Sequence, residues 1–137
     1  MRGNSYEHRT TIEMLEQRAL QFGARVQRER SVWLGSSHGY TDLSVSLQSV
    51  RADIEAENDA RRVANDVRKA IASQATHLFI VAPTAAVART CACKLGGLAI
   101  PSGGPVVRVC TLGTALHQLS VLLSSVRSTS PPAQAAP

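Results

Sequence analysis

The chain has 137 residues, which is enough for one domain with a single hydrophobic core. Its hydrophobic content of 44% and charged content of 18% are ordinary for a globular protein and exclude a chain that is disordered throughout. No apolar run reaches the roughly 20 residues of a membrane-spanning helix, and residues 1–8 lack the apolar stretch of a signal peptide. We therefore expect a cytoplasmic protein.

The charges are distributed unevenly along the chain. The net charge is +5, and 13 of the 15 basic residues are arginine, which pairs with phosphate groups in a bidentate way. Six of the ten acidic residues lie between residues 42 and 66, so the rest of the chain is distinctly basic. A basic body around a small acidic centre suits a metal-dependent enzyme that acts on nucleic acid.

The first third of the chain predicts a helix followed by a strand. Residues 6–22 carry apolar side chains at helical spacing, with Ser5 as the N-cap and Gly23 at the position of a left-handed C-cap. Residues 24–34 predict a strand, and residues 35–39 predict the turn that follows it.

The next stretch predicts a hairpin with an acidic face. Residues 40–47 and 50–57 both alternate with period 2, so each segment has one apolar and one polar face. Asp42, Glu55 and Glu57 gather on the polar side. Clustered carboxylates raise their pKa values or recruit a cation, and Mg²⁺ takes oxygen ligands of this kind. The alternative interpretation is a solvated polar face that happens to be acidic.

The second half of the chain predicts helices that alternate with strands. The clearest helix covers residues 60–75, and its predicted buried stripe consists of Val63, Val67, Ala70 and Ile71. The later elements are a buried strand over 76–82, a helix over 84–95, a buried strand over 106–112, a helix over 114–126 and a disordered tail over 127–137. This alternation implies parallel, right-handed crossovers joined to an antiparallel first half. The predicted fold is an α/β three-layer sandwich with a mixed sheet, in one domain over residues 1–126.

The order of elements and the acidic hairpin together resemble the PD-(D/E)XK nuclease superfamily, which includes many restriction enzymes and the archaeal Holliday-junction resolvases. In that superfamily an Asp opens the second core strand, and a Glu-x-Lys motif lies on the third. Here Asp42 ends the segment Gly-Tyr-Thr-Asp, and Glu55 lies in the segment Ile-Glu-Ala-Glu. The resemblance covers residues 6–112 and implies an αβββαβ core, followed here by an additional helix, strand and C-terminal helix.

The resemblance implies a metal-dependent nuclease that acts on nucleic acid, with DNA expected. Asp42 and Glu55 would ligate Mg²⁺ or Mn²⁺, with the backbone carbonyl of Ala56 as a further ligand. The chain departs from the motif at Glu57, which stands where the superfamily has lysine. Three alternatives follow: Glu57 acts as the base or as an extra ligand, Lys69 from the following helix replaces the motif lysine, or the site is inactive.

Other residues are assigned to the site on the same resemblance. Glu13 in the first helix is the candidate for an additional acid, ahead of Glu7, whereas the isolated His8 receives no role. The residues expected to hold the phosphate backbone are Arg61, Arg62, Asn65 and Arg68. A domain of this size is expected to act as a homodimer or as a subunit of a larger complex. The competing interpretation is a catalytically inactive nuclease-fold subunit that binds nucleic acid or assembles with other proteins.

Overall fold

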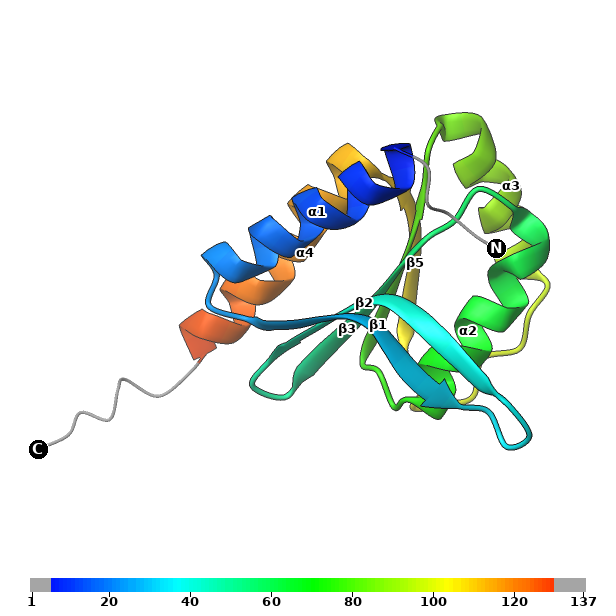
Figure 1. Ribbon diagram of the computed structural model, residues 1–137, viewed down its shortest axis with the longest axis horizontal. Coiled ribbons are helices and arrows are strands. Elements are labelled where there is room, and N and C mark those ends of the chain that lie inside the picture. Colours follow the sequence, from blue (N-terminus) through cyan, green and yellow to red (C-terminus); the bar gives the residue numbers. More distant parts are fainter. Residues whose placement is uncertain (1–5, 130–137) are drawn as a thin grey trace, which may run out of the picture.

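The structure is a computed structural model, which describes residues 6–129 (Figure 1). Its elements in chain order are α1 (Tyr6–Gln21), β1 (Arg25–Trp33), β2 (His38–Leu47), β3 (Val50–Ala56), the 3-10 turn η1 (Ala60–Arg62), α2 (Val63–Ala72), β4 (His77–Ala82), α3 (Ala85–Gly96), β5 (Val106–Thr111) and α4 (Leu112–Thr129). The five strands form one sheet in the order β1-β2-β3-β4-β5.

Helices cover both faces of this sheet. Strands β1, β2 and β3 are antiparallel neighbours, whereas β3, β4 and β5 run parallel. Helices α1 and α4 pack on one face, and α2 and α3 pack on the other (Figure 1). The connections β3–α2–β4 and β4–α3–β5 both place their helix on the same face, as crossovers of one hand do when they run in the same direction along the sheet. The predicted three-layer α/β sandwich with a mixed sheet is therefore confirmed.

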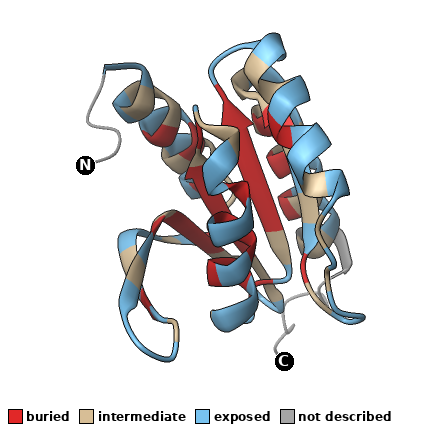
Figure 2. Cartoon of the chain, turned by 90° about the vertical axis from the view of Figure 1, so that its right-hand side faces the viewer, coloured by how far each residue is buried: buried red, intermediate tan, exposed pale blue. Residues whose placement is uncertain are grey.

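Strand β4 lies in the middle of the parallel half and separates two hydrophobic cores. Phe79 and Val81 point into the core beneath α1 and α4. Leu78 and Ile80 point into the core beneath α2 and α3. Figure 2 shows that buried residues follow this strand for most of its length. The prediction of a strand buried on both faces is confirmed, because helices cover the sheet on each side.

Strand β5 differs from its prediction as a buried strand. Its side chains alternate between exposed and half-buried, Val106 is 48% exposed, and Cys110 is its one buried residue. The physical reason is position, since β5 is the last strand of the sheet and has a neighbour on one side only. Apolar composition alone does not distinguish an edge strand from a central one.

The helix boundaries confirm most of the sequence predictions. Helix α1 ends at Gln21, and Gly23, two residues later, has the left-handed φ of 80° that glycine tolerates. The predicted cap Ser5 lies outside the described residues. The helix predicted over 60–75 is divided into η1 and α2, and the side chain of Asp59 caps η1 by accepting from the Arg61 amide at 2.9 Å. Helix α4 extends to Thr129, so three residues of the predicted tail are helical, and residues 130–137 lie outside the described part.

Within residues 6–129, no helix combines the length and the apolar character that a membrane crossing requires.

The sheet divides at one point, and this division positions the candidate site. Pairing between β2 and β3 ends at Leu43 and Ile54. Beyond this pair, β2 continues beside β1 and β3 continues beside β4, so the two halves of the sheet separate. The next residues after the last pair are Asp42 on β2 and Glu55 on β3. The two carboxylates predicted to share a site therefore lie where the strands part.

Candidate active site

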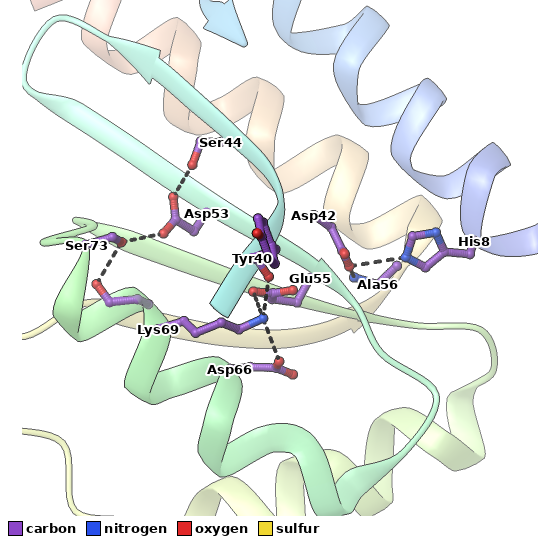
Figure 3. A network of polar contacts seen from close by, with 11 residues as sticks. His8, Tyr40, Asp42, Ser44, Asp53, Glu55, Ala56, Asp66, Lys69 and Ser73 are labelled. Atoms are coloured by element: carbon purple, nitrogen blue, oxygen red, sulfur yellow. Dashed lines mark hydrogen bonds and ion pairs between the residues drawn. The ribbon is translucent and has the colours of Figure 1, made fainter. Parts of the chain in front are cut away.

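Helix α2 and strand β3, with the residues that directly follow them, face each other through three polar contacts, which we call the polar ladder; Figure 3 shows the first two of these contacts. The ladder pairs Asp53 with Ser73, Glu55 with Lys69, and Glu57 with Asp66. Asp53 and Glu55 on β3, and Glu57 directly after it, are alternate residues, so they project from one face. Asp66 and Lys69 on α2, and Ser73 at its C-cap, are spaced by three and four residues, so they occupy one side of the helix. Glu55 and Glu57 of the predicted acidic face are therefore buried rather than solvated, whereas Asp42 is half-buried.

Lys69 is the central member of the ladder and connects the separated strands. Its ammonium lies 2.8 Å from a carboxylate oxygen of Glu55 and donates a hydrogen bond to the backbone carbonyl of Tyr40 at 2.7 Å. Lys69 is 4% exposed and Glu55 is fully buried. Removing an ion pair from water is costly unless each charge keeps good partners, and this arrangement supplies them. Because Glu55 belongs to β3 and Tyr40 to β2, Lys69 joins the two halves of the sheet.

Asp42 is held at the division from two directions. Its Oδ2 accepts a hydrogen bond from the backbone amide of Ala56 at 2.8 Å and lies 3.3 Å from Nε2 of His8 on α1 (Figure 3). The Ala56 amide lies beyond the last β2–β3 pair, so the carboxylate takes the place of a strand partner for this donor. The fold thus fixes the Asp42 carboxylate before any ligand arrives.

The contact between Asp66 and Glu57 gives Glu57 a structural role. Asp66 is buried, and burial together with a hydrogen bond to Glu57 and the negative charges of Glu55 and Glu57 raises its pKa to about 10. At neutral pH this pair of carboxyl groups therefore shares a proton, which the raised pKa places on Asp66. A second Glu57 contact, from the Asp59 amide at 3.2 Å, lies at the start of η1. Both contacts hold the segment that leads into α2.

A cavity of about 470 Å³ opens beside the ladder. Its walls come from α1, β1, β2, η1 and α2, and the lining residues are His8, Glu29, Tyr40, Asp42, Arg62, Asn65, Asp66 and Lys69. Acidic, basic and amide side chains therefore converge on one space at the division of the sheet. This polar lining suits a charged ligand more than an apolar one.

The structure brings some predicted site residues to this cavity and leaves others elsewhere. Asp42, Lys69, Arg62 and Asn65 line it, and Glu55 contacts Lys69 directly. The remaining predicted residues have other surroundings: Glu57 is buried beside Asp66, Arg61 pairs with Asp59 at 2.8 Å, Arg68 donates to the Leu34 carbonyl at 3.2 Å, and Glu13 and Glu7 are exposed on α1. The proposed role of the Ala56 carbonyl stays a prediction.

Sequence reasoning missed His8, although the helical pattern carried a signal for it. His8 lies one turn before Ile12, which begins the buried stripe of α1, so both side chains occupy the face that packs on the sheet. Glu29 and Tyr40 were also not assigned to the site. Glu29 lies between β1 residues that pair across from Leu43 and Thr41, and this register was not available from the sequence.

The side chains of the site meet the ligand requirements of a hard divalent cation only in part. Among the described residues, no group of three or more His, Cys, Asp or Glu side chains is arranged to hold a metal ion. Mg²⁺ needs fewer protein ligands, because it commonly binds one or two carboxylates and completes its shell with water and phosphate oxygens. The site contains the carboxyl groups of Asp42 and Glu55, the ammonium of Lys69 at 2.8 Å from Glu55 and, in the cavity wall, the guanidinium of Arg62. A cation at Asp42 and Glu55 stays a prediction.

Gly39 allows the Lys69 side chain to pass close to β2. A Cβ at this position would lie 3.0 Å from Cδ of Lys69 and 3.2 Å from Cδ1 of Leu34, closer than ordinary packing permits. We expect Gly39→Ala to displace the lysine and to lower the free energy of unfolding by about 1–3 kcal/mol, measured by urea denaturation.

The matched control for Gly39 is Gly113→Ala in α4, where an added Cβ would meet nothing within 4 Å. This variant should be as stable as the wild type or slightly more stable, because alanine favours a helix over glycine. Equal stability of Gly39→Ala and the wild type would show that Lys69 does not need the close approach.

No protein-family model, curated protein or solved structure matches this chain. The function must therefore be inferred from the geometry of the site and from the resemblance of its motif.

Proposed function

We propose that this protein is a metal-dependent nuclease that hydrolyses phosphodiester bonds of nucleic acid, with DNA as the expected substrate. The observation that carries the proposal is the buried contact between Lys69 and Glu55, 2.8 Å long, at the division of the sheet beside Asp42. The motif resemblance requires an ammonium close to an Asp and a Glu on neighbouring strands. Lys69 meets this requirement from α2, although residue 57, directly after β3, is a glutamate.

In this proposal Asp42 and Glu55 hold Mg²⁺ or Mn²⁺, with the Ala56 carbonyl as a further ligand. A divalent cation bound there supplies Lewis-acid activation of the phosphate and lowers the pKa of a bound water. Lys69 orients the attacking water and neutralises charge that develops on the phosphate oxygens. The Tyr40 carbonyl, which accepts from Lys69 at 2.7 Å, keeps the ammonium directed at this position. Glu57 holds the segment before α2 and has no chemical step.

Side chains around the cavity supply contacts for the nucleic acid. Arg62 and Asn65 line the cavity and are positioned to hold backbone phosphates without reading sequence. Trp33 and Tyr40 are 57% and 59% exposed on the β1–β2 hairpin, and the Trp33 ring packs edge-on against His38 at 5.0 Å. Exposed aromatic rings beside basic residues stack on unpaired bases. These side chains therefore favour a substrate that contains a single-stranded or distorted segment.

Cleavage of supercoiled plasmid and of single-stranded DNA tests the nuclease proposal. The wild type should cut with Mg²⁺ or Mn²⁺ and stop in EDTA, whereas Glu55→Gln should lose cutting because a metal ligand is removed. Glu13→Gln is the matched control, since it removes an exposed carboxylate of α1 that does not line the cavity. Metal-dependent cutting that Glu13→Gln keeps and Glu55→Gln loses supports the proposal. Failure of the wild type to cut with either metal would overturn it.

One observation favours the alternative of a catalytically inactive subunit that binds nucleic acid or assembles with other proteins. The predicted ligands already have protein partners, because Lys69 contacts Glu55 and the Ala56 amide contacts Asp42. A metal would have to share or displace these contacts. Isothermal titration with Mn²⁺ distinguishes the two functions: heat of binding that Glu55→Gln abolishes supports the nuclease, and no binding by the wild type supports the inactive subunit.

A further inference from the structure

A second cavity, of about 330 Å³, lies over strands β1, β2 and β3. The register pairs Arg25 with Ser46 and Ser46 with Arg51, so two arginines flank one serine in a row across three neighbouring strands. Arg30 and Ser44 also line this cavity. Guanidinium and hydroxyl groups therefore converge here, beside the Asp53 end of the polar ladder and away from Lys69.

The guanidinium groups of this cavity have unused hydrogen-bond donors. Within the described part of the chain, Nη1 of Arg30 and both Nε and Nη2 of Arg51 are buried and have no hydrogen-bond partner. A buried donor without a partner is costly, and the cost is greater when the group is charged. Burial and the nearby charge of Arg30 also lower the pKa of Arg51. An anion in the cavity would relieve both costs.

The protein's own carboxylate does not fill this role. Asp53 lies 3.8 Å from Nε of Arg51, which is beyond hydrogen-bond distance. Its two oxygens accept instead from the hydroxyl groups of Ser44 and Ser73, both at 2.7 Å. This one carboxylate leaves the buried donors of Arg30 and Arg51 without a hydrogen-bond acceptor, and no acidic side chain of the described residues lines the cavity. An anion that enters the cavity would supply the missing acceptors.

We propose that the cavity between Arg25, Arg30 and Arg51 binds a phosphate group of a nucleic-acid strand. The assignment of this phosphate to a nucleic-acid strand rests on the proposed nuclease function. A phosphate offers several acceptor oxygens, which fit the forked donors of arginine and the hydroxyl group of Ser46.

The position of the cavity fits a backbone phosphate next to the phosphodiester that would be hydrolysed. Asp42 lines the candidate active site and Ser44 lines the phosphate cavity, and alternate residues of a strand project from the same face about 7 Å apart. On β1, Glu29 lines the first cavity and Arg30 lines the second. The phosphate site would thus hold the strand beside the position of cleavage.

Binding of labelled single-stranded DNA, measured by fluorescence anisotropy in EDTA, tests this proposal without cleavage. The double variant Arg25→Ala/Arg51→Met should bind about 10-fold more weakly, and its log–log salt slope should fall by about 0.7 for the lost phosphate contact. Arg89→Ala/Arg108→Ala removes the same charge from exposed arginines that do not line the cavity, and should weaken binding by less than about threefold. If the double variant does not fold, Arg25→Ala, at an exposed residue, is compared with Arg89→Ala, which also removes one exposed arginine.

Inorganic phosphate identifies the ligand group independently. Phosphate should raise the Tm of the wild type and of the control variant but not of Arg25→Ala/Arg51→Met. Loss of this shift together with weaker DNA binding supports the nucleic-acid source. If the double variant loses the phosphate-induced rise in Tm but binds DNA as well as the wild type does, the cavity is a phosphate site whose ligand is a free phosphorylated molecule. An equal shift in the wild type and the double variant would overturn the site, whether or not the protein cuts DNA.

Discussion

Replacement of Lys69 by methionine is expected to lower the cleavage rate by about 10²–10³-fold and the free energy of unfolding by about 3–5 kcal/mol. Methionine keeps the length of the side chain but removes the charge. Glu55, which is fully buried, would lose its ion-pair partner, and the Tyr40 carbonyl would lose its donor. The rate is measured on supercoiled plasmid and the stability by urea denaturation.

A second variant separates the chemical role of Lys69 from its structural role. Lys69→Met/Glu55→Gln removes both charges, so it should recover most of the lost stability, because a buried pair of charges is replaced by uncharged groups. It should remain inactive. Lys94→Met removes the only other lysine of the chain, which is exposed on α3, and should change neither quantity. If Lys69→Met cut DNA as fast as the wild type while Glu57→Gln did not, Glu57 would be the base and the assignment of Lys69 would be wrong.

The fold and the two central carboxylates were predictable because strand periodicity is a local property. Period-2 alternation determines which residues of 40–57 share a face, so Asp42 and Glu55 could be placed together without knowledge of the sheet order. The alternation of helices and strands in the second half likewise predicted the parallel crossovers. The division of the sheet between β2 and β3 was not predictable, because it depends on how each strand pairs with its outer neighbour.

The rotation of α2 could not be obtained from its apolar residues. The sequence predicted Ile71 in the buried stripe, but Ile71 is 36% exposed. Asp66 and Lys69 are buried instead, because the sheet face beneath this side of α2 carries Glu55 and Glu57. Polar residues on the side of a helix that packs on a polar strand show the same sequence pattern as polar residues on the side that faces water. The sequence therefore left the choice between Glu57 and Lys69 open, and the structure adds that Lys69 contacts Glu55 whereas Glu57 lies beside Asp66.

Replacement of Asp66 by asparagine is expected to stabilise the protein, by an amount that grows with pH. The pKa of Asp66 is about 10 in the folded protein and near 3.8 in its unperturbed form. Between these values the folded state keeps a proton that the unfolded state has released, so the free energy of unfolding falls as the pH rises. The amide side chain introduced by Asp66→Asn donates to Glu57 without titrating. The stability difference between variant and wild type should therefore grow by up to about 4 kcal/mol from pH 5 to pH 8.

Urea denaturation at pH 5, 6, 7 and 8 measures this difference, and Asp59→Asn is the matched control. Hydrogen bonds from Arg61 lower the pKa of Asp59 to about 2, so its stabilising contribution is present above pH 4 and is lost only as the pH falls toward 2. The Asp59 variant should consequently differ from the wild type by a constant amount over the same range. Parallel curves for the Asp66 variant and the wild type would mean that Asp66 is ionised in the folded protein. Lys69 would then neutralise two ladder carboxylates instead of one, and Glu57 would be less firmly held beside the candidate metal site.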